Sequence, residues 1–146
     1  MGTSIVKVTT KNNSTPSWAI LNGENVQLLN IQSESHIGVM NTYFNQRSNF
    51  EAAIDANKIA KSDVEFHAPL DRKIQMFAQG LNYATHRAES GLVVDAEEEE
   101  NLMFAKASSS LCGPNDNILR PQGCELLDYE IELGIILKTD IHKPTK

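Results

Sequence analysis

The alternate carboxylates of Asp128-Tyr129-Glu130-Ile131-Glu132-Leu133 are the side chains of this sequence best suited to chemistry. In a β-strand, alternate residues point to the same face, so Glu130 and Glu132 would lie about 6.6 Å apart along the strand. Two carboxylates at that spacing repel each other unless a cation lies between them, and Mg²⁺ prefers oxygen ligands. The same alternation describes any strand with one face in water. The pattern therefore leaves two interpretations open, a metal site and a solvated strand face.

His86 and Glu89 form a second candidate pair. If the chain is helical from Tyr83 to Glu89, the two side chains lie three residues apart on the same helix face. Glu89 could then orient His86, whose imidazole exchanges its proton near neutral pH, as a general base. The alternative is an ordinary contact between two surface side chains.

The elements that would position these side chains follow from the periodicity of the sequence. Asn22-Gly23 predicts a hairpin, and Ser48 followed by Glu51 predicts the start of a helix, with Ser48 as its N-cap. The helical period continues over residues 48–61. Apolar or β-branched runs predict strands or extended chain at residues 4–9, 18–21, 26–29, 64–70, 73–78, 102–105 and 127–137, of which 102–105 is expected to be buried. Residues 113–117 have the composition of a loop.

We expect two parts, because Pro69 and Asp71-Arg72 interrupt the pattern near residue 70. Residues 1–70 would form a small N-terminal lobe rich in β-strands, and residues 71–146 a second unit. The expected fold class is α+β and predominantly β.

Composition excludes several classes of function. The 146 residues carry a formal net charge of −6 with dispersed Lys and Arg, which speaks against nucleic-acid binding. No apolar run approaches the roughly 20 residues that span a bilayer, and no signal peptide is evident, so we expect a cytoplasmic protein without a membrane partner. Cys112 and Cys124 lack metal-binding spacing and are expected to be reduced thiols. The run Glu97–Glu100 is interpreted as a solvated face.

Five separated motifs together resemble the core of the fumarylacetoacetate hydrolase family. They are, in order, Gly80-Leu81-Asn82-Tyr83, His86-x-x-Glu89, Phe104-Ala105-Lys106 with Ser108-Ser109-Ser110-Leu111, Gly113-Pro114-Asn115-Asp116, and Asp128-Tyr129-Glu130-Ile131-Glu132-Leu133. The resemblance covers about residues 73–138, and residues 1–70 look like the smaller, more variable N-terminal lobe of many members. It implies that residues 71–146 begin the mixed β-sandwich or roll core of the catalytic domain. Gln79 and Gly80 stand where fumarylacetoacetase has an extra carboxylate ligand, so the chain looks more similar to the shorter bacterial-type members.

The resemblance implies an enzyme that uses Mg²⁺ or Mn²⁺ and acts on short 2-oxo or 1,3-diketo acids. Glu130 and Glu132 would bind the metal, which polarises the oxo-acid group and stabilises an enolate. His86 and Glu89 would activate a water for attack on a carbonyl carbon. The expected reaction is hydrolysis of a carbon–carbon bond in an acylpyruvate-like or fumarylpyruvate-like acid.

The resemblance also points to substrate contacts at Tyr83 and Lys106, although a packed tyrosine and a lysine at the solvent end of a strand are equally ordinary. It implies a homodimer, and a third metal ligand some tens of residues beyond Glu132, past Lys146. We therefore expect a truncated catalytic domain that is inactive alone. Two alternatives stay open: a 2-oxo acid decarboxylase, isomerase or hydratase of the same family, and a non-catalytic, truncated assembly module.

Overall fold

The computed structural model describes residues 3–80, 83, 102–137 and 142. The chain divides into two compact units, one made of residues 1–69 with 113–146 and the other of residues 70–112. The predicted division into residues 1–70 and 71–146 assigns the end of the chain differently and stays a prediction. The described elements are rich in strands, which agrees with the predicted predominantly β fold, whereas the sandwich or roll stays a prediction.

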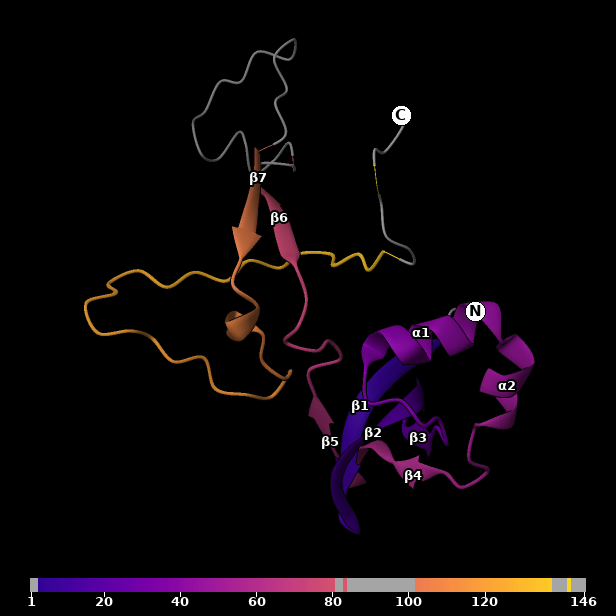
Figure 1. The fold of residues 1–146 in the computed structure, drawn as a ribbon. Helices are drawn as coiled ribbons and strands as arrows, with labels where there is room; N and C mark the ends of the chain where they lie inside the picture. The colour runs from indigo at the N-terminus through magenta and orange to yellow at the C-terminus, as the bar shows by residue number, and fades with distance from the viewer. Residues whose placement is uncertain (1–2, 81–82, 84–101, 138–141, 143–146) are drawn as a thin grey trace. The chain divides into compact units, whose positions relative to one another are not determined.

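An antiparallel five-stranded sheet forms the centre of the first unit, in the order β4-β3-β2-β1-β5 (Figure 1). Its strands are β1 (Ser4–Thr10), β2 (Asn13–Asn22), β3 (Asn25–Leu28), β4 (Ile59–Ala60) and β5 (Val64–His67). The strands predicted at residues 4–9, 18–21 and 26–29 are confirmed, and β2 begins earlier than predicted. Asn22 pairs with Asn25 around a two-residue loop. Gly23 in that loop has φ +59°, so the predicted hairpin is confirmed.

The sheet has apolar side chains on both faces because alternate residues of β1 and β2 point to opposite sides. One buried cluster joins Trp18 and Leu29 to Val39 and Phe50. The last two come from the helices α1 (His36–Asn45) and α2 (Arg47–Ala52), so these helices cover that face. A separate buried cluster on the other face contains Val8, Ala19 and Val26.

The prediction of one helix over residues 48–61 is wrong. Ser48 is not an N-cap, because α2 begins at Arg47 after Gln46 and ends at Ala52. After α2 the backbone pairs with β3: the Asp55 N–H donates to the Leu28 carbonyl at 2.8 Å, and β4 pairs with β3. These sheet contacts satisfy the backbone groups that a longer helix would have used, so tertiary pairing overrides the helical period.

The second unit contains an antiparallel pair of strands, β6 (Met76–Gly80) and β7 (Leu102–Lys106) (Figure 1). The strands predicted at residues 73–78 and 102–105 are thereby confirmed, with β6 shifted toward Gly80. The predicted burial of residues 102–105 is wrong, because every residue of β7 is exposed. An apolar run indicates that a strand is able to be buried, whereas burial itself needs a layer packed on it.

Residues 113–137 contain a predicted loop and a predicted strand with different outcomes. The loop is confirmed as a turn, in which the Asp116 carboxylate accepts a hydrogen bond from the Gly113 N–H at 2.7 Å. The strand predicted at residues 127–137 is wrong: this segment forms no ladder with any strand in the described part of the chain, and its side chains are exposed. Alternation fixes which residues would share a face, but a strand also needs a neighbour to pair with.

Among the described residues, no helix combines the length and the apolarity that crossing a membrane requires.

Candidate functional site

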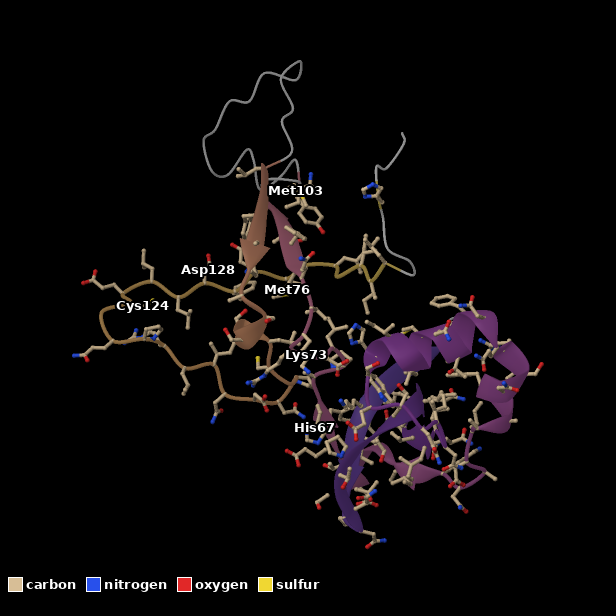
Figure 2. All side chains as sticks on the ribbon, viewed as in Figure 1. His67, Lys73, Met76, Met103, Cys124 and Asp128 are labelled. Carbon is tan, nitrogen blue, oxygen red and sulfur yellow. The ribbon has the colours of Figure 1, made fainter. Side chains whose placement is uncertain are left out.

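The predicted site residues lie in three places along the chain. His86 and Glu89 lie outside the described residues, in the connection between β6 and β7. Tyr83 is described and is 48% exposed. Lys106 is the last residue of β7, and Glu130 and Glu132 lie on the exposed chain after Asp128, which Figure 2 labels.

Lys106 lies beside an aromatic ring on the β6–β7 strand pair. Its Nζ is 5.9 Å from the ring centroid of Phe104, and the two side chains share one face of β7. Phe104 stands opposite Ala78, whose small side chain leaves the ring accessible from that face. A cation next to an exposed ring offers a charge for a carboxylate and an apolar surface for the carbon skeleton of an organic acid.

Gly80 is the last residue of β6 and comes shortly before the predicted pair His86 and Glu89 in the sequence. A Cβ added to Gly80 would lie 3.0 Å from Cδ2 of Leu102, its cross-strand partner. The Leu102 side chain therefore packs across the glycine, and a larger residue at position 80 would displace it. Close packing therefore favours glycine at position 80, which is also the first residue of the family motif.

Glu130 and Glu132 carry the right chemistry for a hard cation but are exposed in this structure. Two carboxylates suit Mg²⁺ or Mn²⁺, which bind oxygen ligands. Within the described ranges, no group of three or more His, Cys, Asp or Glu side chains comes together to hold a metal ion. The donor atoms of these two residues fit the metal, and the assembled site stays a prediction.

A cluster of polar and aromatic side chains on α1 and α2 escaped prediction. The Arg47 guanidinium lies 4.6 Å from the Tyr43 ring centroid, and its Nε donates to Glu51 Oε1 at 2.8 Å. Hydrogen bonds from the Thr3 hydroxyl and then from Arg47 lower the pKa of Tyr43. The hydrogen bond to Glu51 raises the pKa of Arg47. The spacing of Arg47 and Glu51 was a signal in the sequence, and their contact ties the surface of α2 together.

An open pocket of about 370 Å³ lies between residues 16–18 in the middle of β2 and residues 29–34. Trp18 forms part of its wall, but the indole Nε1 is buried and has no hydrogen-bond partner in the part of the chain that the structure describes. A ligand in the pocket could not reach a nitrogen that solvent does not reach. The Trp18 N–H is therefore not a binding group of this pocket.

Comparison with known proteins bears on residues 75–146. They match the family described as fumarylacetoacetate (FAA) hydrolase, C-terminal. A protein of Burkholderia ambifaria strain MC40-6, named only as a hydrolase, is 48% identical to this chain over 60 residues. Similarly named proteins of Burkholderia cenocepacia strain HI2424 and Burkholderia multivorans are 48% identical over 58 residues.

These matches cover only part of this chain and only part of each relative. The Burkholderia ambifaria match covers 41% of this chain and 20% of the relative, so the aligned stretch is about a fifth of the relative's length. No solved structure matches the chain.

Proposed function

Because residues 75–146 belong to the fumarylacetoacetate hydrolase family, we propose that this chain carries part of the active site of a metal-dependent hydrolase. The proposed reaction is cleavage of a carbon–carbon bond in a short 1,3-diketo acid, of the acylpyruvate or fumarylpyruvate type. The family match over these residues is the observation that carries the proposal, and the relatives named as hydrolases support it.

Glu130 and Glu132 are the proposed metal ligands in this chain. Their carboxylate oxygens suit Mg²⁺ and Mn²⁺, and their alternate positions allow both side chains to turn to one side when the segment is extended. When bound, such a cation acts as a Lewis acid that stabilises negative charge developing on the oxygen of an oxo acid.

The other predicted residues have roles in binding and in proton transfer. Lys106, next to the Phe104 ring, would hold a substrate carboxylate, and Tyr83 would contact the same substrate. His86, oriented by Glu89, would accept a proton from the attacking water. Each role belongs to a residue that the family resemblance also indicates.

A thermal unfolding experiment tests metal binding without requiring activity. A cation that binds only the folded chain raises the melting temperature, with about 2.7 kcal/mol of stabilisation at a concentration 100 times the Kd. We expect Mg²⁺ or Mn²⁺ to raise the melting temperature of the natural chain. The Glu130→Gln variant should lose this shift.

Glu125→Gln is the matched control, because Glu125 is an exposed carboxylate on the same stretch of chain. It should keep the full metal-dependent shift. Equal shifts in both variants, or no shift in the natural chain with either cation, would contradict the proposed ligands.

The reaction itself is tested in a protein that joins these residues to the rest of the family's catalytic domain, by supplying fumarylpyruvate, an acylpyruvate and oxaloacetate with Mg²⁺ and following their ultraviolet absorbance. Loss of oxaloacetate alone would favour the decarboxylase alternative. Loss of fumarylpyruvate or the acylpyruvate would favour carbon–carbon hydrolysis, once product analysis excludes isomerisation and hydration.

One observation favours the second candidate, a non-catalytic assembly module. The apolar residues of the segment 129–137 are 48–86% exposed, which is unusual for large apolar side chains that have no partner to bind. A metal-independent melting temperature together with stable self-association would support this module over the hydrolase.

A further inference from the structure

The tip of the β2–β3 hairpin combines three features that allow an asparagine to modify itself. Asn22 is the only asparagine of the sequence that is followed by glycine. Asn22 and Gly23 are both exposed, and the Asn22 carboxamide has no hydrogen-bond partner in the described part of the chain. The Gly23 N–H likewise donates no hydrogen bond to any described group. An electrophilic amide carbon and a neighbouring backbone nitrogen are therefore both unengaged.

We infer that Asn22 is a site of spontaneous deamidation, at which the chain closes into a succinimide with Gly23 and reopens as aspartate or isoaspartate. Asparagine is one of the residues whose side chain is chemically least durable. The inference rests on the hairpin and not on the proposed enzymatic function.

The reaction needs water and no other reagent. The backbone nitrogen of Gly23 loses its proton and bonds to Cγ of Asn22, and the bond from Cγ to Nδ2 breaks to release ammonia. Water then opens the ring. Attack at Cγ restores the normal backbone and leaves aspartate, whereas attack at the backbone carbonyl carbon of residue 22 leaves isoaspartate, in which the main chain runs through Cβ and Cγ.

The local structure permits ring closure at little conformational cost. Gly23 carries no Cβ to obstruct the approach, and nothing lies within 4 Å of the place that a Cβ would take. Asn22 pairs with Asn25 in the last rung of the β2–β3 ladder. Ring closure requires this one rung to open, and the end of a ladder opens more readily than its interior.

Asn13 is a natural comparison at the other end of β2. It is also exposed, but its Oδ1 accepts a hydrogen bond from the Thr15 N–H at 2.9 Å, which holds the carboxamide toward Thr15. The next residue, Ser14, has a Cβ that hinders approach of its nitrogen. We therefore expect Asn13 to be modified much more slowly than Asn22.

Isoaspartate at position 22 would disturb the edge of the sheet. The Glu24 carbonyl accepts a hydrogen bond from the Lys61 N–H at 2.9 Å, and Asn25 pairs with Ala60 of β4. Isoaspartate adds one atom to the main chain next to this turn, so the turn cannot keep both contacts in their present geometry. Normal aspartate adds a charge beside Glu24 and leaves the length of the backbone unchanged.

Peptide mapping by mass spectrometry tests the modification in the natural chain, after incubation at mildly alkaline pH. We expect Asn22 to convert to aspartate and isoaspartate several-fold faster than Asn13 and Asn115, which are exposed asparagines followed by other residues. Electron-transfer fragmentation distinguishes the two products. Conversion of Asn22 no faster than Asn115 would overturn the inference, and this comparison needs no variant to fold.

The Ser14→Gly variant separates the effect of structure from that of the dipeptide. It creates a second Asn-Gly pair, in which the Asn13 carboxamide is still positioned to bond the Thr15 N–H. Asn13 in this variant should react more slowly than Asn22. Equal rates would mean that sequence alone decides, which would overturn the structural argument.

Melting temperature and hydrogen–deuterium exchange test the consequence for the sheet. Purified chain with isoaspartate at position 22 should melt at a lower temperature than the natural chain, with faster exchange in β3 and β4. Asn22→Asp is the matched control, because it has the charge without the extra backbone atom, and it should melt close to the natural chain. Equal melting temperatures of the isoaspartate chain and Asn22→Asp would contradict the predicted disturbance.

Discussion

At the scale of single residues, Trp18 combines favourable packing with an unfavourable polar contact. It is 3% exposed within the cluster that also contains Leu29 and Phe50, and the Lys7 Nζ lies 5.3 Å from its ring centroid. Its Nε1 has no hydrogen-bond partner among the described residues. A buried donor left unpaired costs about 1–3 kcal/mol, so this residue contributes less stability than its size suggests.

Trp18→Phe should therefore lower the free energy of unfolding by only about 1 kcal/mol, because removing the unpaired N–H offsets the lost ring contacts. Phe50→Ala, in the same cluster and 1% exposed, should cost about 3–5 kcal/mol. Urea unfolding followed by circular dichroism measures both. A loss for Trp18→Phe as large as for Phe50→Ala would show that the indole nitrogen carries no net cost.

Tyr43 gives a prediction about pH. Hydrogen bonds from Thr3 and then Arg47 lower its pKa in the folded chain. Any stability gained from the lowered pKa is present above the pKa of the unfolded tyrosine and is lost as the pH falls through the folded pKa. Thr3→Val should raise the Tyr43 pKa toward its ordinary value, and Arg47→Met should raise it too, because it removes both a hydrogen bond and a nearby positive charge.

The measurement is a spectrophotometric tyrosine titration in a background with Tyr83→Phe and Tyr129→Phe, since the chain has three tyrosines. Thr15→Val, at an exposed position on β2, is the control and should leave the titration unchanged. An unaltered Tyr43 titration in Thr3→Val would contradict the assigned cause.

At the scale of elements, the β2–β3 hairpin depends on the backbone conformation of Gly23. Its φ of +59° is one that residues with a side chain rarely adopt, although nothing lies within 4 Å of a Cβ at this position. The requirement is thus conformational and not a matter of space.

Gly23→Val should destabilise the chain by about 1–2 kcal/mol, because a β-branched residue is strained in the left-handed region. Gly23→Asn is the matched control and should cost much less, since asparagine tolerates this conformation. Urea denaturation of both variants gives the comparison, and equal costs would mean that the turn changes its conformation.

The same elements show what the sequence is able to predict. Period-2 runs and the Asn22-Gly23 turn are local signals, and the first three strands follow from them. Helix α1 was not predicted, because residues 36–45 include Gly38 and several residues of modest helix propensity. Two features of the structure favour a helix there. Val39 is buried, and Ser35 caps the helix, with its Oγ accepting a hydrogen bond from the Gly38 N–H at 3.2 Å.

The candidate site also has one aspect that the local sequence predicts and one that it does not. Alternation along a strand predicts which residues would share a face. It was enough to predict the direction of Lys106 on its strand and to predict that Glu130 and Glu132 would share a face. Which residues from separate segments meet depends on long-range pairing, which alternation does not determine. For Glu130 and Glu132, even the strand itself requires a partner that the local sequence does not contain.

At the scale of the whole molecule, burial is concentrated in the first part of the chain. Every buried apolar side chain among the described residues lies between Val8 and Phe50, whereas the large apolar residues of β7 and of residues 118–137 are exposed. Cooperative stability should follow this division, because local stability rises with buried apolar contacts and protected hydrogen bonds.

Hydrogen–deuterium exchange should therefore show slow exchange in β1 and β2 and fast exchange over residues 129–137 in dilute solution. Exchange in β3, which is paired on both sides, is the internal control and should be slow. Strong protection of residues 129–137 in a dilute monomer would contradict their unpaired state.

The burial of Trp18 has a practical consequence, because it is the only tryptophan in the chain. Its fluorescence emission reports on the sheet and helices of residues 4–67 and is blind, apart from indirect effects, to events elsewhere. A change in β-structure at residues 129–137 would alter the infrared amide bands while leaving the tryptophan emission maximum in place. Two optical signals thus give separate readings of the folded core and of the exposed segment 129–137.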